Sequence, residues 1–148
     1  MQYSQRAARL VKEFEGFSAT PYQCPAGRMT IAYGHSNTPS LKQVTVAEAN
    51  IILDRDLTVL SVYLNQKIGV SLTQGQFDAL CSLIYNWGAG KFYRSKGLVL
   101  LNQGKYKLAA KEFFSKERGV VNISGKFSNG LYRRRCAEFK LWNKGANQ

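Results

Sequence analysis

The sequence predicts an α+β fold, with a small antiparallel sheet lobe over residues 1–44, a long connecting helix over residues 45–67 and a helical lobe over residues 68–148. Three observations predict it. The helical period of the apolar residues disappears over residues 17–34, a capping pattern at Thr45 precedes a long periodic run, and the rest of the chain has the pattern of successive helices. Strands and helices that are segregated along the chain are typical of this class. With 148 residues, of which 45% are apolar, we expect one compact domain.

The first predicted element is a helix that starts after Ser4 and ends near Glu15. A serine in this position accepts a hydrogen bond from a backbone N–H of the first turn. The apolar side chains of Leu10, Val11 and Phe14 then share one face, and the glycine that follows Glu15 is a typical stop.

A small antiparallel sheet is predicted next, because the helical period is absent and Pro21, Pro25 and Gly27 punctuate the segment. The stretch MTIAY, residues 29–33, has alternating residues of β type. Alternation predicts small side chains on one face of the strand and larger ones on the other, namely Thr30, Ala32 and Gly34 against Met29, Ile31 and Tyr33.

A long helix is predicted from Thr45 to about Lys67, because Thr45 and Glu48 have the spacing of a capping box. At about 1.5 Å per residue this helix is roughly 35 Å long, enough to bridge two lobes. The apolar run QGQFDALCSLIYNWG, capped by Thr73, is predicted to be the central helix of the second lobe. Further helices are predicted near Ser95–Leu101, Lys105–Lys116 and Leu131–Trp142.

The chain is strongly basic, with 21 Lys and Arg against 9 Asp and Glu, a net charge of +12 and a pI near 9.9. Opposite fields speed encounter, so we expect an anionic partner: nucleic acid, an acidic membrane surface, or an anionic polymer such as bacterial cell wall. Solubility alone is the other explanation. No apolar run approaches the roughly 20 residues of a membrane span, and the N-terminus lacks the apolar core of a signal peptide, so neither is expected.

The cysteines, Cys24, Cys81 and Cys136, are too few and too scattered for a disulfide framework or a zinc site. Cys81 and Cys136 lie in helix-like runs and are expected to be small buried thiols. Cys24 lies in a polar turn. With one histidine and scattered carboxylates, neither a metal site nor another cofactor is expected.

Glu15 is the first candidate for chemistry. At the carboxyl end of a helix the macrodipole is negative, which is expected to raise the pKa of a carboxyl group toward the value that a general acid needs near neutral pH. Glu13 is the competing acid, on a different azimuth of the helix. The alternative for either residue is a solvated surface carboxylate.

Thr30 and Cys24 are the next candidates, because a hydroxyl can hold and orient a water molecule and a thiol can support it or act as a base. Arg28 is a nearby cation that would lower the thiol pKa. The alternatives are a β-branched residue that stabilises the sheet and an inert thiol in a turn.

The only histidine, His35, is expected to be structural rather than catalytic and to pair with Asp56 of the long helix. Asn86 and Trp87, at the end of the central helix, are candidates for sugar contacts, with helix termination as the alternative. The run Arg133–Arg135 covers three azimuths of one helix, so one or two of these arginines are expected to reach an acidic ligand and the rest to be solvated.

Together these residues resemble the signature of phage-type lysozymes of glycoside hydrolase family 24. The matching motif is Glu15-Gly16, Tyr22, Cys24, Gly27 and the run TIAYGH from Thr30 to His35. The pattern around Thr45, the run FDALCSLIYNWGAG and the run GLYRRRCAEFKLW resemble other segments of the family, so the resemblance spans nearly the whole chain. Cys24 stands where many members have Asp, and Ala32 stands where Gly is common.

The resemblance implies a single lysozyme-like catalytic domain that hydrolyses the β-1,4 bond between N-acetylmuramic acid and N-acetylglucosamine of peptidoglycan. Glu15 would protonate the leaving oxygen, and Thr30 with Cys24 would position water on the opposite face, giving inversion. Tyr33, Asn86 and Arg133 would bind the substrate.

We also expect a monomer that binds no nucleic acid, with electrostatic contact to an anionic membrane surface as a further expectation. The enzyme would accumulate in the host cytoplasm and reach the cell wall through a holin-type lesion.

Two other functions are compatible with parts of this pattern. A lytic transglycosylase would cleave the same bond with one acid and no held water, leaving 1,6-anhydro ends. A non-catalytic module that binds nucleic acid would line one groove with basic and stacking aromatic residues, whereas here the basic residues are spread along the chain.

Overall fold

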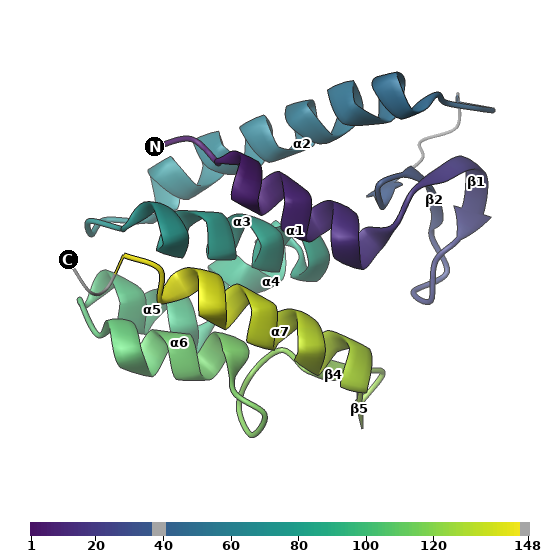
Figure 1. Ribbon diagram of the computed structural model, residues 1–148. Coiled ribbons are helices and arrows are strands. Elements are labelled where there is room, and N and C mark those ends of the chain that lie inside the picture. The colour runs from purple at the N-terminus through teal and green to yellow at the C-terminus, as the bar shows by residue number, and fades with distance from the viewer. Residues whose placement is uncertain (37–40, 146–148) are drawn as a thin grey trace.

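The computed structural model describes residues 1–36 and 41–145. The predicted order of elements is confirmed: a helix, a small sheet, a long helix and a group of helices (Figure 1). Helix α1 spans Gln5–Glu15 and begins at Ser4, whose hydroxyl accepts a hydrogen bond from the backbone N–H of Arg6. Asp78 of the central helix, which is fully buried, accepts hydrogen bonds from both the backbone N–H and the hydroxyl of Ser4. The start of α1 is thereby joined to the core.

The predicted sheet is present and has three antiparallel strands in the order β1-β2-β3, formed by Ser18–Gln23, Met29–Ala32 and His35–Ser36. The predicted alternation does not continue to Gly34, because β2 ends at Ala32; Thr30, Ile31 and Ala32 are all buried. Ala32 has a φ of 59° and Gly34 a φ of 70°, so the chain leaves the extended conformation at Ala32 and turns back. Side chains beyond this turn no longer follow the period of the strand.

Capping boxes start helices α2 and α3. Helix α2, Val46–Lys67, begins at the predicted box, in which the Glu48 N–H donates to Thr45 and the Thr45 N–H donates to Glu48. Helix α3, Gln74–Trp87, begins at Thr73, which forms a second box with Gln76. Satisfying the free N–H groups of the first turn in this way stabilises each helix start by roughly 1 kcal/mol.

Helix α3 lies at the centre of the helical part, with α1, α2 and α7 packed around it (Figure 1). The remaining elements are α4 Ala89–Tyr93, α5 Lys96–Asn102, α6 Tyr106–Phe114, the hairpin of β4 Asn122–Ile123 and β5 Lys126–Phe127, and α7 Asn129–Trp142. Helix α4 and this hairpin were not predicted from the sequence. Both are very short, and the hairpin turns through Ser124 and Gly125, which have φ values of 49° and 77°.

The buried apolar residues form two clusters. The larger one is centred on α3, and the smaller one joins the sheet to α2 through Ile31, Ala32, Val44 and Ala49. Tyr33 packs against both clusters, so the turn after β2 sits where the sheet meets the helices. In the part of the chain that the structure describes, no helix is both long and apolar enough to cross a membrane.

Candidate active site

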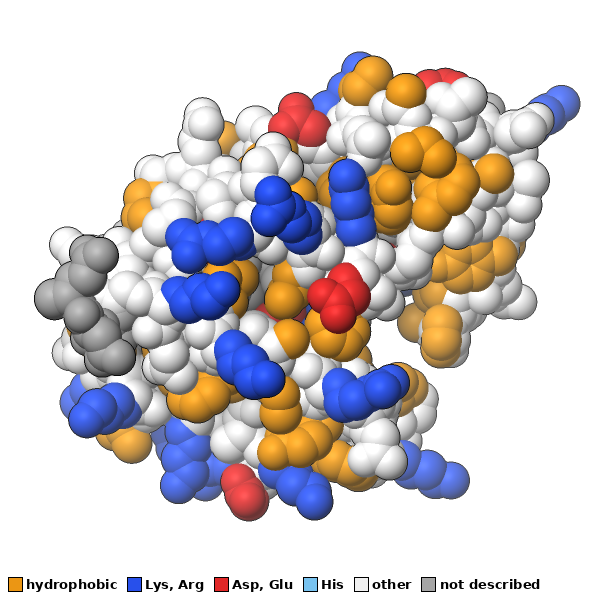
Figure 2. Space-filling model, viewed as in Figure 1, with side chains coloured by type: hydrophobic (Ala, Val, Ile, Leu, Met, Phe, Trp, Pro, Cys, Tyr) orange, Lys and Arg blue, Asp and Glu red, His pale blue; other side chains and the backbone are white. Residues whose placement is uncertain are grey.

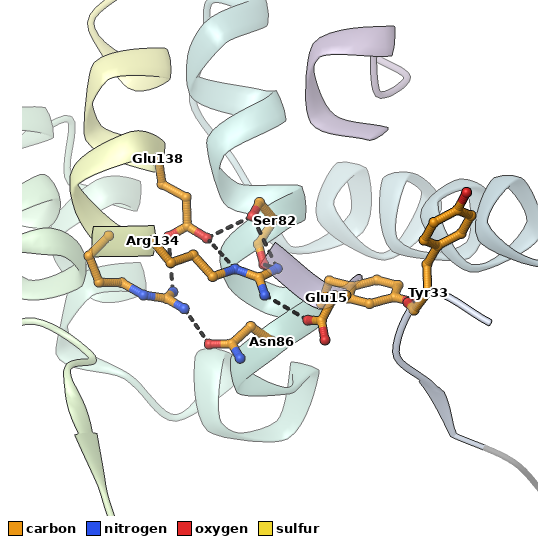
Figure 3. Close-up of polar contacts among 8 residues, drawn as sticks. Glu15, Tyr33, Ser82, Asn86, Arg134 and Glu138 are labelled. Carbon is orange, nitrogen blue, oxygen red and sulfur yellow. Dashed lines mark hydrogen bonds and ion pairs between the residues drawn. The ribbon is translucent and has the colours of Figure 1, made fainter. Parts of the chain in front are cut away.

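Glu15 is the last residue of α1, and its side chain is held by an arginine from the far end of the chain. Arg134 of α7 donates from Nη1 to Glu15 Oε1 at 2.6 Å (Figure 3). The carboxylate side chain is 20% exposed and the guanidinium only 4%. Glu15 therefore remains accessible while its partner is buried behind it. The positive guanidinium opposes the negative end of the helix, which the sequence alone did not reveal.

Arg134 is itself fixed by groups from α3 and α7. Its Nε lies 3.3 Å from Glu138 Oε1, and its Nη2 donates to the carbonyl of Ser82 at 3.2 Å. The Ser82 hydroxyl donates to Glu138 Oε1 at 2.7 Å, which closes a network in the core (Figure 3). A planar guanidinium held at three nitrogens has little freedom to rotate, so the position of Glu15 Oε1 is set by the core of the protein.

Arg135 forms the second half of this network. Its Nη1 lies 3.0 Å from Glu138 Oε2, and its Nη2 donates to Asn86 Oδ1. Burial lowers the pKa of Arg135 to about 10. Burial also raises the pKa of Glu138, against the opposite effect of the two arginines. The side chains of Arg135 and Glu138 are 0% exposed, so these two charges depend on each other and on the neighbouring Arg134 for compensation.

The turn after β2 presses against the other side of Glu15. Gly34 has a φ of 70°, and a Cβ atom added there would lie 2.5 Å from Glu15 Oε2. The Tyr85 hydroxyl of α3 donates to the carbonyl of Tyr33, which ties the turn to the central helix. Burial raises the pKa of Tyr85, so its hydroxyl remains a donor. Glycine is therefore required for this close approach of the backbone to the carboxylate.

Tyr33 also presents an aromatic face beside this site. Its ring lies 5.6 Å from that of Phe17, and Lys12 Nζ lies 5.2 Å from its centroid. The residue is partly exposed, and an aromatic ring can contact a sugar, so its role as a substrate-binding residue stays a prediction.

Cys24 and Thr30 lie together on the neighbouring strands β1 and β2. Thr30 is 5% exposed and donates from its hydroxyl to the carbonyl of Arg28 at 3.1 Å. The pKa of the Cys24 thiol is lowered, first by a hydrogen bond from the Arg28 backbone and also by the Thr30 hydroxyl. A larger fraction of this thiol is therefore in the thiolate form near neutral pH than in an ordinary cysteine.

Tyr22 connects these two residues to Glu15. It is the register partner of Thr30 in the sheet. Its pKa is raised, first by burial and then by the nearby negative charges of Glu15 and Cys24. Tyr22 is thus within electrostatic range of both Glu15 and Cys24.

The predicted pairing of His35 with Asp56 is present, with Nδ1 and Oδ2 2.6 Å apart. It joins β3 to α2, which is the attachment expected for a structural histidine. Figure 2 shows that the outline of the molecule is indented between the part that carries the sheet and the part that carries the β4–β5 hairpin. Glu15 ends α1 on this side of the molecule (Figure 1).

The arginine run was only partly understood from the sequence. Arg133 is exposed, which a substrate-binding residue must be. The expectation that the arginines of the run that do not reach a ligand are solvated is wrong. Arg134 is 3% exposed and Arg135 0%. The signal that could have located them is the spacing of Arg134 and Glu138, four residues apart on one helix face.

Two further expectations have mixed outcomes. Cys81 is fully buried, as predicted, but Cys136 is partly exposed, which contradicts the expectation of a buried thiol. Asn86 is engaged by Arg135 rather than pointing freely to solvent. Within residues 1–36 and 41–145, no cluster of three or more His, Cys, Asp or Glu side chains has the arrangement of a metal site.

Comparison with known proteins gives consistent matches over nearly the whole chain. The model of the phage lysozyme family matches residues 12–146. The endolysin of Acyrthosiphon pisum secondary endosymbiont phage 1 is 38% identical over 143 residues, which cover 96% of this chain and 98% of that protein.

Two solved structures resemble the fold closely. The muramidase domain of SpmX from Asticaccaulis excentricus has a TM-score of 0.80 at 32% identity, covering 95% of this chain and 97% of that one. The endolysin from Escherichia coli O157:H7 phage FAHEc1 has a TM-score of 0.77 at 30% identity, covering 96% and 93%. The predicted fold class is thereby confirmed.

Proposed function

This chain belongs to the phage lysozyme family, and we propose that Glu15 is the acid with which it cleaves the glycosidic bonds of peptidoglycan. It is a glycoside hydrolase of the endolysin type, whose substrate is peptidoglycan and whose task is lysis of the host cell. The bond cleaved is the β-1,4 link between N-acetylmuramic acid and N-acetylglucosamine, and the whole chain acts as one catalytic domain.

The observation that carries the assignment of Glu15 is the way its side chain is held. A partly exposed carboxylate is bonded on Oε1 by a buried guanidinium and meets the Gly34 turn on Oε2. A general acid must be held within hydrogen-bonding reach of the oxygen that it protonates. Glu13, the competing acid, is exposed on α1, and among the described residues its carboxylate has no such arginine partner.

Thr30 and Cys24 supply the second half of the reaction. In an inverting glycosidase a water molecule attacks from the face of the sugar opposite the acid. The Thr30 hydroxyl can accept from this water and direct its lone pair, and the Cys24 thiolate, favoured by its lowered pKa, can take its proton. The sugar oxygen leaves with the proton from Glu15, and the attacking oxygen remains on the anomeric carbon with inverted configuration.

The remaining site residues bind or support. Tyr33 offers its ring to a sugar, and Arg133 offers its exposed guanidinium to a carboxylate of the substrate. Asn86 is proposed to act near the substrate through its bond with Arg135. His35 and Asp56 keep the sheet in place against α2.

The decisive experiment compares Glu15→Gln with the matched control Glu13→Gln on purified peptidoglycan. Loss of a general acid lowers turnover by about 10²- to 10⁴-fold, so we expect this loss for Glu15→Gln and near-parental turnover for Glu13→Gln. An active Glu15→Gln protein with unchanged circular dichroism would refute the assignment.

Mass spectrometry of the same digests tests the reaction type. Hydrolysis leaves reducing ends, whereas a lytic transglycosylase leaves 1,6-anhydro ends. Two cysteine variants test the water-holding group: Cys24→Asp should keep activity and Cys24→Ala should reduce it. Anhydro products, or full activity of Cys24→Ala, would remove Cys24 from the mechanism.

The enzyme is a phage lysis protein that acts on the cell wall. We propose that it works as a monomer without nucleic acid, accumulates in the host cytoplasm and reaches the wall through a holin-type lesion. Fractionation of cells that express it with and without a holin tests this route. Clearing of the culture without a holin would contradict it.

A further inference from the structure

Helices α1 and α7 together present a basic surface beside the proposed active site, which we call the basic face. Its members are the outward-pointing cations of these two helices and of the turn that follows α7: Arg6, Arg9, Lys12, Arg133, Lys140 and Lys144. Figure 2 shows blue side chains gathered on this side of the molecule, over the two helices that lie in front in Figure 1. The two helices contact each other and converge where Arg134 bonds Glu15.

Most of these charges are left uncompensated by the protein. Arg9, Arg133 and Lys140 are exposed, and their side chains make no ion pair or hydrogen bond within residues 1–36 and 41–145. Arg6 reaches the edge of Asp78 at 3.8 Å, a weak contact for a side chain that is 42% exposed. Like charges that are held close together on two helices repel one another, so the basic face is stabilised when an anionic partner covers it.

We propose that the basic face binds the carboxylates of peptidoglycan stem peptides outside the glycan strand that is being cut. This inference rests on the proposed function, because it extends the substrate from the cleaved bond to the surrounding polymer. The same two helices carry Glu15 and Arg134, so a strand seated at Glu15 brings its neighbours over the basic face. At physiological salt a charge acts over about 8 Å, which favours carboxylates that are in contact with the face.

The composition of the basic face favours such a polymer over a membrane. A helix that lies in a bilayer surface needs large apolar side chains next to its cations. Among the large exposed hydrophobic residues, α7 contributes Phe139 and α1 none. A site for single-stranded nucleic acid uses several exposed stacking rings. Of the aromatic residues on these two helices, Phe139 is the one that is exposed, whereas Phe14 and Tyr132 are half-buried and Trp142 is buried.

The test measures binding to purified sacculi in the inactive Glu15→Gln background, so that cleavage does not confuse the result. One variant reverses two charges of the basic face, Arg9→Glu with Lys140→Glu. The matched control reverses Arg55 and Lys91, which are exposed on α2 and α4. Each pair has an arginine within a helix and a lysine in the last turn of its helix, and each lowers the net charge equally. Circular dichroism confirms the fold of both.

We expect the basic-face variant to bind sacculi about tenfold more weakly at low salt, with the difference shrinking as salt rises, and the control to lose less than twofold. Sacculi whose carboxylates have been amidated should bind the parent and the basic-face variant equally. Equal losses for the two variants, or an undiminished difference on amidated sacculi, would overturn the proposal.

Binding to vesicles of anionic phospholipid is measured in parallel. If the basic-face variant loses vesicle binding but keeps sacculus binding, the partner is a membrane and the proposal fails. The proposed function is tested separately, by turnover in the active background. If the basic-face variant still forms reducing ends, the assignment of Glu15 as the acid stands, whatever the binding result.

Discussion

Replacing Arg134 with Met should destabilise the fold strongly, because it removes one of the two arginines that compensate the buried carboxylate of Glu138. Arg134 contacts Glu138, whose side chain is 0% exposed, and also bonds Ser82 and Glu15. Removing one partner of a buried ion pair costs about 3–5 kcal/mol. For a chain of this length each kcal/mol lowers the melting temperature by about 2–4 °C, so we expect a decrease of about 10 °C.

The assay is thermal unfolding followed by circular dichroism, with Arg133→Met as the control. Arg133 is the adjacent residue on the same helix and is exposed, so its loss should change the free energy of unfolding by less than about 0.5 kcal/mol. A second variant, Arg134→Lys, keeps the charge but cannot reproduce the planar fork and should lie between the parent and Arg134→Met. If Arg134→Met melts within about 2 °C of the parent, the argument that the buried carboxylate of Glu138 needs both arginines is wrong.

Three further predictions concern the sheet side of the site. Gly34→Ala places a Cβ atom 2.5 Å from the carboxylate oxygen of the proposed acid and should lower turnover at least tenfold. The control, Gly104→Ala, also has a positive φ, 75°, but open space around it, so it should affect stability alone. Equal turnover in the two variants would contradict this reasoning. His35→Ala removes the 2.6 Å hydrogen bond to Asp56 of α2 and should lower the free energy of unfolding by about 1–3 kcal/mol, as measured by urea titration. Its effect on turnover, measured in a lysis assay, should be small. A large loss of turnover with unchanged stability would indicate a chemical role. Because the pKa of Cys24 lies below its ordinary value of 9.0, its alkylation by iodoacetamide should rise with pH through a midpoint below 9. Cys81, with a pKa of about 12, should stay unreacted over the same range. Mass spectrometry of the alkylated peptides measures both, and equal labelling of the two cysteines would refute this difference.

Local rules were sufficient for the helices that begin at Ser4, Thr45 and Thr73, but not for the short helix α4, which has no side-chain cap. Ser4, Thr45 and Thr73 each start a helix, as their side-chain oxygens predicted, because a cap depends on residues within one turn of it. The failure along β2 has an equally local cause that the sequence does not display. Ala32 adopts a φ of 59°, a conformation that non-glycine residues rarely take and that an alanine in the sequence does not predict.

For the site, the pattern of residue types identified Glu15, Thr30 and Cys24 as candidates, since their chemistry and spacing are visible in one short stretch of sequence. The sequence missed Arg134, which is 119 positions away from Glu15. It also missed the part played by Ser82 and Glu138, because a polar residue in a helical run looks the same whether it faces solvent or the core.

What the sequence determined by itself is therefore the order and caps of the helices, the place of the small sheet and the family to which the chain belongs, since all of these are written in neighbouring residues or in motifs. Which carboxylate is held, and by which arginine, was decided only when α1, α3 and α7 packed together. Packing selects Arg134 over Arg133 because a guanidinium can be buried only where acceptors such as Ser82 and Glu138 are already in place, and those acceptors come from separate segments of the chain.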